Sequence, residues 1–291
     1  MESQRSQLAV ASAVLLVAAF ACDGETRVEH PFRGVTHLIR VEEVPRKVTM
    51  HVVRVDLDTP GLSFRLTPPG GSRETARQTT LEFLREQRAQ IAVNAHFFTP
   101  FPSKDKEAFL IGLAASDGKV YSTCEQPEQS YAILANAPAV NIDAQNRARI
   151  VHCEAIGLWN TVSGSAQIIT NGVATIPGYR DGELTPGRGY SSEKSWYDVK
   201  TARTVLGLAG PRTLYIFTVD RAGGSEGMTL AEIADLLIRE YNVSNALNLD
   251  GGGSTTLAME DPRTSEPRIV NVSSDNPNGR SVASSLAIFI R

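Results

Sequence analysis

The segment 246–256 constrains this chain most, because a hydrophobic run there ends in an acid and three consecutive glycines. Residues 246–249 predict a short buried strand, so Asp250 lies where a strand stops and a turn begins. Glycine tolerates positive φ and has no Cβ, so the backbone N–H groups after Asp250 can converge on a ligand. A carboxylate beside such amides predicts a site for an anionic or sugar substrate, with acid, base or metal chemistry. The alternative is a glycine-rich turn that only makes a bend.

The residues before this motif predict a helix that leads into its strand. Thr229 and Glu232 are spaced as a capping box, and apolar residues recur with a helical period as far as Tyr241. Residues 213–219 predict a strand ahead of the helix, so the three segments have the size of a right-handed parallel crossover. Asp250 then follows the C-terminal end of a strand, where such units bind ligands.

The rest of the chain predicts mostly short strands. We expect strands over residues 48–57, 62–66 and 286–290, and a helix over 75–88 that Thr79 and Glu82 cap. A strand over 91–93 delivers Asn94 and His96 at its end, and residues 111–176 alternate strands with turns. The predicted fold is therefore a single α+β domain with a mixed, mostly antiparallel sheet system, covering helices and one strand-helix-strand unit.

Residues 178–200 lack a hydrophobic period and carry four aromatic side chains, Tyr179, Tyr190, Trp196 and Tyr197. A loop of this length inside a compact domain is typical of a lid or a binding loop. Aromatic rings stack well on sugar faces, so we expect this loop to close over the substrate.

The N-terminus predicts export. An apolar stretch over residues 8–20 follows Arg5 and ends in a small-x-small sequence, which is typical of a signal peptide over residues 1–21. Cleavage after Ala21 leaves Cys22 first, so the alternatives are lipid attachment at Cys22, which implies membrane attachment, and ordinary secretory cleavage. Residues 22–45 are then expected to be a tether and residues 46–291 the domain. The exported protein would be periplasmic or on the cell surface.

Composition excludes one class of partner and leaves one disulfide open. The net charge of −3 and the pI near 6.0 do not favour nucleic-acid binding, which usually requires a basic excess. In an exported protein Cys124 and Cys153 predict a disulfide, the alternative being two separate buried thiols. Three cysteines without paired-ligand spacing argue against a structural zinc site.

Several of these segments together resemble the phosphodiester glycosidase family. The matching stretches, in chain order, are VNAHFF (93–98), ITNG (169–172), ART (202–204), the helix over 228–241, NLDGGGSTT (248–256) and GRSVA (279–283). The resemblance covers most of the chain from about residue 48 onward, and NLDGGGS is its most specific part. It implies hydrolysis of a sugar-1-phosphodiester on the sugar side of the bridging oxygen, which releases free sugar and a phosphomonoester.

This chemistry suits the residue types at the matching positions. Asp250 is expected to be the principal carboxylate, as general base or nucleophile, with His96 and Arg203 as further catalytic residues. Arg203 and Arg280 can donate charge-assisted hydrogen bonds to the phosphodiester. The expected substrate-binding residues are Asn94, Asn171, Gly251, Gly252, Gly253, Ser254, Thr255 and Arg280.

Other assignments stay open at this stage. The second acid could be Asp220, Glu193 or Asp198, and Asp250 could instead bind a divalent cation together with Asn248 or Asp220. No cofactor is required by the sequence, and the oligomeric state is not predicted. The alternative to an enzyme is a noncatalytic surface module that binds polysaccharide or phosphoglycan through the same residues.

Overall fold

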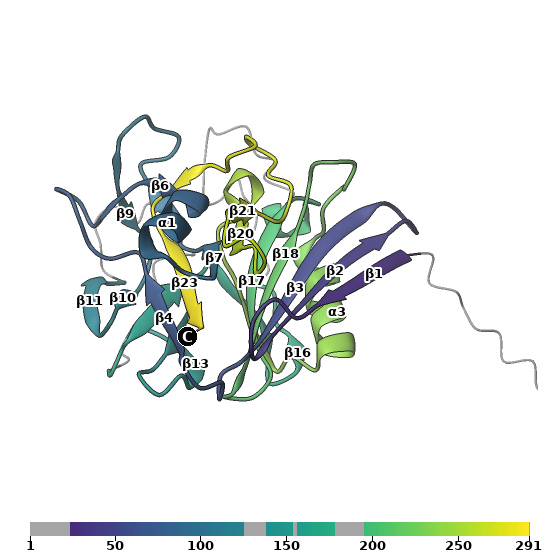
Figure 1. The fold of residues 1–291 in the computed structure, drawn as a ribbon, viewed down its shortest axis with the longest axis horizontal. Coiled ribbons are helices and arrows are strands. Elements are labelled where there is room, and N and C mark those ends of the chain that lie inside the picture. Colours follow the sequence, from purple (N-terminus) through teal and green to yellow (C-terminus); the bar gives the residue numbers. More distant parts are fainter. Residues whose placement is uncertain (1–23, 125–137, 154–155, 178–194, 291) are drawn as a thin grey trace, which may run out of the picture.

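The computed structural model describes residues 24–124, 138–153, 156–177 and 195–290. The predicted signal peptide, Cys22, Glu193, Tyr179 and Tyr190 lie outside these residues. Within the described part, strands form five sheets in which every paired strand is antiparallel, and two α-helices lie against them (Figure 1). The mixed sheet that we expected is therefore not observed there.

Two large sheets build the body of the molecule. The first has eight strands, in the order β1 (Gly24–Glu29), β2 (Val35–Glu42), β3 (Val48–Asp56), β18 (Thr213–Val219), β17 (Arg203–Leu208), β19 (Asn245–Asn248), β15 (Ala166–Thr170) and β16 (Val173–Ala174). The second has five, in the order β21 (Pro267–Ile269), β20 (Leu257–Glu260), β7 (Ile91–Asn94), β23 (Ser285–Ile290) and β4 (Leu62–Leu66).

Three smaller sheets complete the described strands. A third sheet contains β11 (Lys119–Ser122), β10 (Ala114–Ser116), β14 (Asn160–Ser163), β12 (Ala139–Ile142) and β13 (Ala148–Val151). The others join β5 (Thr75–Ala76), β9 (Glu107–Leu110) and β8 (Phe98–Thr99), and β22 (Ser281–Val282) with β6 (Gln78–Thr79). Cys124 and Cys153 form a disulfide beside the third sheet.

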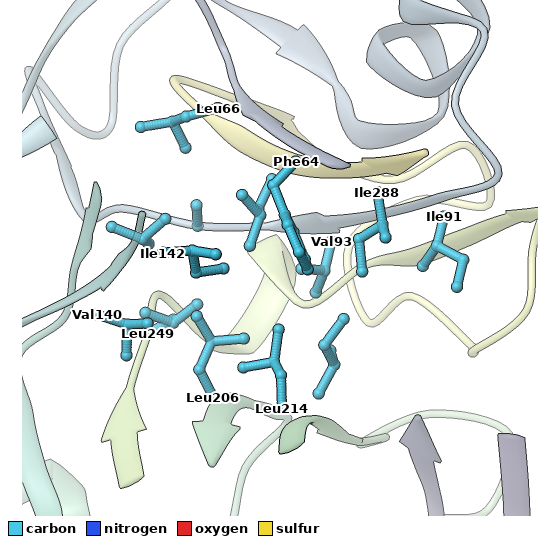
Figure 2. Close-up of a cluster of buried hydrophobic side chains, with 14 of the residues drawn as sticks. Phe64, Leu66, Ile91, Val93, Val140, Ile142, Leu206, Leu214, Leu249 and Ile288 are labelled. Carbon is cyan, nitrogen blue, oxygen red and sulfur yellow. The ribbon is translucent and has the colours of Figure 1, made fainter. Parts of the chain in front are cut away.

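The main core lies between the two large sheets because their strands alternate apolar side chains on that side. Leu206 and Leu214 of the first sheet share one buried cluster with Phe64 and Ile288 of the second (Figure 2). Such alternation is how a strand places every second residue on one face. Side chains from the third sheet, such as Val140, close the same cluster.

Each helix covers the outer face of one large sheet. Leu230 and Ile233 of α3 (Leu230–Tyr241) pack with Met50 and Phe217 on the first sheet. Leu81 and Leu84 of α1 (Thr80–Gln87) pack with Ala92 and Phe289 on the second. The order of layers is therefore α3, first sheet, second sheet, α1.

Both predicted capping boxes are confirmed. Thr229 accepts a hydrogen bond from the Glu232 amide and caps α3, and Thr79 does the same with Glu82 for α1. The predicted start of the first helix at residue 75 is wrong, because β5 and β6 lie within residues 75–79 and the helix begins at Thr80. No helix of the described residues is long and apolar enough to span a membrane.

The tether predicted over residues 22–45 is wrong for its described part. Residues 24–29 and 35–42 form β1 and β2, which extend the first sheet by antiparallel pairing onto β3. The polar sequence did not predict these strands, because β1 is an edge strand whose residues are exposed along most of its length.

The predicted crossover is present in a split form. β18 and β19 both pair antiparallel with β17, so they run parallel to each other with β17 between them. The helix α3 connects them across one face. Asp250 therefore does follow the C-terminal end of β19, at the edge where β17 begins.

Candidate active site

The segment from Leu249 to Thr256, which we call the crossing segment, carries the chain from the first sheet to the second. The Leu249 amide donates to the Thr204 carbonyl of β17 at 2.9 Å, whereas the Asp250 amide donates to the Ala95 carbonyl beyond β7 at 3.1 Å. The crossing segment is thus bonded to both sheets. It includes one 3-10 turn, η3 (Gly252–Ser254).

Two kinds of constraint act on the three glycines. A Cβ on Gly251 would lie 2.9 Å from the Ala202 carbonyl oxygen, and one on Gly253 would lie 2.2 Å from Arg280 Nη2. Gly252 has open space around it but a φ of +60°, which favours glycine. The sequence motif therefore reflects close packing at two positions and backbone conformation at the third.

The expected cradle of glycine amides is only partly present. The Gly251 N–H donates to Asp250 Oδ1 at 2.9 Å, and the Gly252 N–H donates to the Ala202 carbonyl at 2.8 Å. These two amides are used within the protein, because the turn folds back on its own acid and on β17. Their role is to shape the site around Asp250.

The Asp250 carboxyl combines burial with three stabilising neighbours. Burial raises its pKa to about 6, against the opposing effects of the Ser254 hydrogen bond, the charge of Arg280 and the Gly251 amide. A carboxyl with a pKa near neutrality exchanges protons readily at physiological pH, which suits a general acid or base. Among the predicted site residues, Asp250 has the carboxyl whose pKa suits acid-base chemistry.

Arg280 lies beside this carboxyl and links it to a second one. Its Nη1 donates to Ser254 Oγ at 3.4 Å and its Nε to Asp275 Oδ2 at 2.9 Å. The guanidinium stacks over Phe101, 4.8 Å from the ring centroid. With its side chain 24% exposed, Arg280 can meet an anionic ligand from solvent.

Asp275 is a site residue that sequence reasoning missed. Its Cβ lies 3.0 Å from the position that a Cβ on Gly253 would take, so it stands over the glycine turn. It belongs to a polar segment without hydrophobic period, and no spacing in the sequence singled it out. The structure thus places a carboxylate on each side of the Arg280 side chain.

Asn94 holds the crossing segment in place. Its Nδ2 donates to the Asp250 carbonyl at 2.7 Å, and its Oδ1 accepts from the Thr256 amide at 3.1 Å and from Thr204 Oγ1 at 2.8 Å. The predicted contact of this side chain with sugar is therefore corrected, because its amide is already bonded on both sides. It orients Asp250 through the backbone.

His96 is buried and has protein partners at both ring nitrogens. Nδ1 lies 2.9 Å from Ser284 Oγ, and Nε2 lies 2.9 Å from the Leu113 carbonyl and 3.0 Å from the Ser163 amide. Burial lowers its pKa to about 4, so the ring is neutral near pH 7. These are the contacts of a structural histidine, and they correct the expected catalytic role.

Arg203 is buried next to the site but directs its guanidinium at backbone oxygens. Its Nη2 donates to the carbonyls of Trp196 at 2.6 Å and Val199 at 2.7 Å, and it lies 4.4 Å from the Trp196 ring. Arg203 thus holds η2 (Trp196–Asp198) against β17, which corrects the expected role as a phosphate ligand.

Of two further predicted residues, one is placed away from Asp250 and the other is buried. Asn171 occupies the turn between β15 and β16, and its amide donates to Asn245 Oδ1 at 3.4 Å, at the opposite end of β19 from Asp250. Asn171 therefore forms part of a hairpin turn, which corrects its expected role in binding substrate. Thr255 lies on the crossing segment but is buried.

The candidates for a second acid differ in their surroundings. Asp220 is buried beneath the crossing segment, and Asp198 is exposed on η2. In the same loop Tyr197 is buried in the core under α3, which corrects its expected role as an exposed sugar platform, while Trp196 contacts Phe97. Across the described ranges, no three His, Cys, Asp or Glu side chains gather as a metal site.

Comparison with known proteins identifies the family of this chain. The family model of the phosphodiester glycosidases matches residues 87–289. N-acetylglucosamine-1-phosphodiester alpha-N-acetylglucosaminidase from Mus musculus is 26% identical over 225 residues, and the Homo sapiens enzyme is 25% identical over 199 residues. These alignments cover 76% and 68% of this chain but 42% and 37% of the relatives, so the chain spans about two fifths of their length.

Solved structures share the fold at low identity. A hypothetical protein from Synechocystis superposes with a TM-score of 0.62 at 15% identity, covering 92% of this chain and 64% of that chain. The zebrafish N-acetylglucosamine-1-phosphodiester alpha-N-acetylglucosaminidase catalytic domain, auto-inhibited by its pro-peptide, superposes with a TM-score of 0.61 at 19% identity, covering 94% and 85%. With a family model that spans most of the chain and includes the crossing segment, this chain belongs to the phosphodiester glycosidase family.

Proposed function

We propose that this chain is an exported hydrolase that cleaves the glycosidic bond of a sugar-1-phosphodiester in glycan or cell-envelope polysaccharide metabolism. The family supports hydrolysis of phosphodiester-linked sugars, and the mouse and human relatives are N-acetylglucosamine-1-phosphodiester alpha-N-acetylglucosaminidases. The observation that carries the proposal is the Asp250 carboxyl, with its pKa raised to about 6, beside the partly exposed guanidinium of Arg280.

The two groups divide the reaction between them. Arg280 binds the phosphodiester oxygens and stabilises the charge that grows on the phosphate as the bond breaks, so the leaving oxygen needs little protonation. Asp250 acts at the anomeric carbon, either directly as a nucleophile or by removing a proton from the attacking water. Water supplies the new hydroxyl of the sugar, the carbon–oxygen bond to phosphate breaks, and the second product is a phosphomonoester.

Export rests on the N-terminal sequence. The apolar stretch over residues 8–20 supports a signal peptide, and Cys22 supports lipid attachment as the alternative to ordinary secretion. Incorporation of a radiolabelled fatty acid into the wild type and into the variant Cys22→Ser separates these routes, because lipid attachment requires Cys22 whereas ordinary secretion does not.

The decisive experiment is product analysis on a panel of sugar-1-phosphodiesters and envelope polymers, with and without chelator. We expect free sugar and a phosphomonoester from the wild type, and a loss of turnover of at least about a hundredfold in Asp250→Asn, because an acid-base group is removed. Asp235→Asn, an exposed change of the same kind on α3, is the matched control and keeps full activity. Full turnover by Asp250→Asn contradicts the assignment, and binding without hydrolysis by the wild type identifies a noncatalytic glycan-binding module.

A further inference from the structure

The buried Asp220 contacts the crossing segment through one asparagine. Asp220 follows the last residue of β18, and its carboxylate accepts hydrogen bonds from Asn271 Nδ2 at 3.1 Å and from the Val272 amide at 3.0 Å. The same Asn271 Nδ2 donates to the Thr255 carbonyl at 3.3 Å, and Asn271 Oδ1 accepts from the Leu257 amide at 2.7 Å. Asp220 therefore orients the side chain that holds the end of the crossing segment.

A line of titratable side chains connects Asp220 to solvent across three strands. His51 Nε2 of β3 lies 4.0 Å from Asp220 Oδ2, and His51 Nδ1 lies 3.1 Å from His37 Nε2 of β2. His37 Nδ1 lies 3.5 Å from Glu29 Oε2 of β1. Both histidines are buried, whereas the Glu29 side chain is 35% exposed. We call these four residues the relay.

Counting hydrogens shows that the relay is one proton short. Its three contacts lie between two carboxylates and two imidazoles, and each neutral imidazole carries a single N–H. Two neutral rings can therefore fill only two of the three contacts. The inner contact has hydrogen-bond length, while the two outer ones, at 3.5 and 4.0 Å, are longer than hydrogen bonds.

We propose that the relay takes up one proton and holds it on Asp220, and that Asp220 is thereby a positioning residue whose charge sets how firmly Asn271 holds the crossing segment. With the proton on Asp220, each of the three contacts has one hydrogen: the Asp220 hydroxyl faces His51, His51 donates to His37, and the His37 N–H faces the Glu29 carboxylate. That the crossing segment carries a catalytic group, Asp250, rests on the proposed function.

The surroundings favour the carboxyl as the place for this proton. Burial lowers the pKa of His37 to about 4 and that of His51 to about 3, whereas burial raises the pKa of Asp220 to about 6. The other charged groups that face the rings are Arg27 of β1 and Arg268 of β21, and both disfavour an imidazolium. A neutral Asp220 accepts hydrogen bonds less strongly than a carboxylate, which weakens its hold on Asn271.

The backbone amide of Val272 reports directly on this proton, because it donates to Asp220 Oδ2. In an NMR titration of the whole chain we expect its shift to change with a midpoint near the pKa of Asp220, about 6, and to show no such transition in Asp220→Asn. The Leu257 amide donates to Asn271 Oδ1, so its protection against hydrogen exchange should decrease at pH values below the same midpoint. Protection here means the exchange rate relative to the intrinsic rate at the same pH.

Glu29→Gln is the discriminating variant, because the glutamine amide brings the third hydrogen to the solvent end of the relay. The new amide donates to His37, each ring then donates inward, and His51 stabilises the ionised Asp220. The midpoint at Val272 should therefore fall by about half a pH unit or more. Glu25→Gln removes the same charge from an exposed position on the same strand and should leave the midpoint unchanged.

An absent transition at Val272, or equal midpoints in Glu29→Gln and Glu25→Gln, overturns the relay. Unchanged protection of Leu257 across the transition overturns the positioning role of Asp220. These readouts need no substrate, so a wild type without hydrolysis counts against the proposed function alone.

Discussion

Substitutions at Gly251 and Gly253 are expected to affect stability and catalysis differently. A methyl group on Gly251 meets a backbone carbonyl, which cannot move without shifting β17, whereas one on Gly253 meets the end of the flexible Arg280 side chain. We expect Gly251→Ala to lower the free energy of unfolding by about 1 to 3 kcal/mol, as overpacking does.

Gly253→Ala should instead leave stability within about 1 kcal/mol, because Arg280 can swing away. The same displacement removes a charge-assisted hydrogen bond to the substrate, so kcat/KM for a sugar-1-phosphodiester should fall about tenfold to a hundredfold. Urea unfolding and steady-state kinetics on both variants test this pair of expectations. An equal loss of stability in the two variants would contradict the distinction.

At the scale of single residues, the sequence predicted which polar side chains lie near the site. It did not predict what those side chains bind. Asn94, His96 and Arg203 all lie near the crossing segment, yet the side chain of each is hydrogen-bonded to other parts of the protein. Those partners come from strands and loops far away in the chain, and no local pattern encodes them. Asp250 was identified because its chemistry and its place at a strand end are both local features.

At the scale of secondary-structure elements, α3 depends on a cap that can be removed without touching the site. Thr229 accepts from the Glu232 amide at 3.2 Å at the N-terminus of the helix. Thr229→Ala should lower the free energy of unfolding by about 1 kcal/mol, whereas Thr229→Ser, which keeps the hydroxyl, should lose a few tenths at most. Chemical denaturation measures both, and equal losses would mean that the hydroxyl does not cap the helix.

Both caps were predictable because each joins residues only three positions apart. The insertion of β17 between β18 and β19 was not, because strand pairing depends on segments that lie far apart in the sequence. The same reason explains β1 and β2, whose polar sequence becomes a pair of strands only because β3 offers an edge to pair with.

At the scale of the whole molecule, five groups with displaced pKa values contribute to the response of stability to acid. The pKa values of His37, His51 and His96 are lowered below their ordinary value, so the unfolded chain binds their protons first and stability falls as the pH drops below about 6.5. The pKa values of Asp220 and Asp250 are raised to about 6, so below that pH the folded chain binds two protons that the unfolded chain does not.

Between about pH 6 and pH 4 the three histidines outweigh the two acids by one proton. These groups should therefore lower the free energy of unfolding by about 1.4 kcal/mol for each unit of falling pH. Asp250→Asn removes one opposing group, so its stability should fall about twice as steeply in this window. Parallel curves for wild type and variant, measured by urea unfolding, would show that Asp250 does not titrate there.

The crossing segment depends on both large sheets for its conformation, because it is hydrogen-bonded to each of them. Residues that hold it come from β7, β17 and the segment after β21, and the chain on either side of it continues into β19 and β20. A peptide that carries the motif alone would lack every one of these supports, so the motif cannot be grafted onto another scaffold as a loop. Engineering a new specificity would have to change residues around the motif, such as the exposed Phe101 and the residues near Asp275.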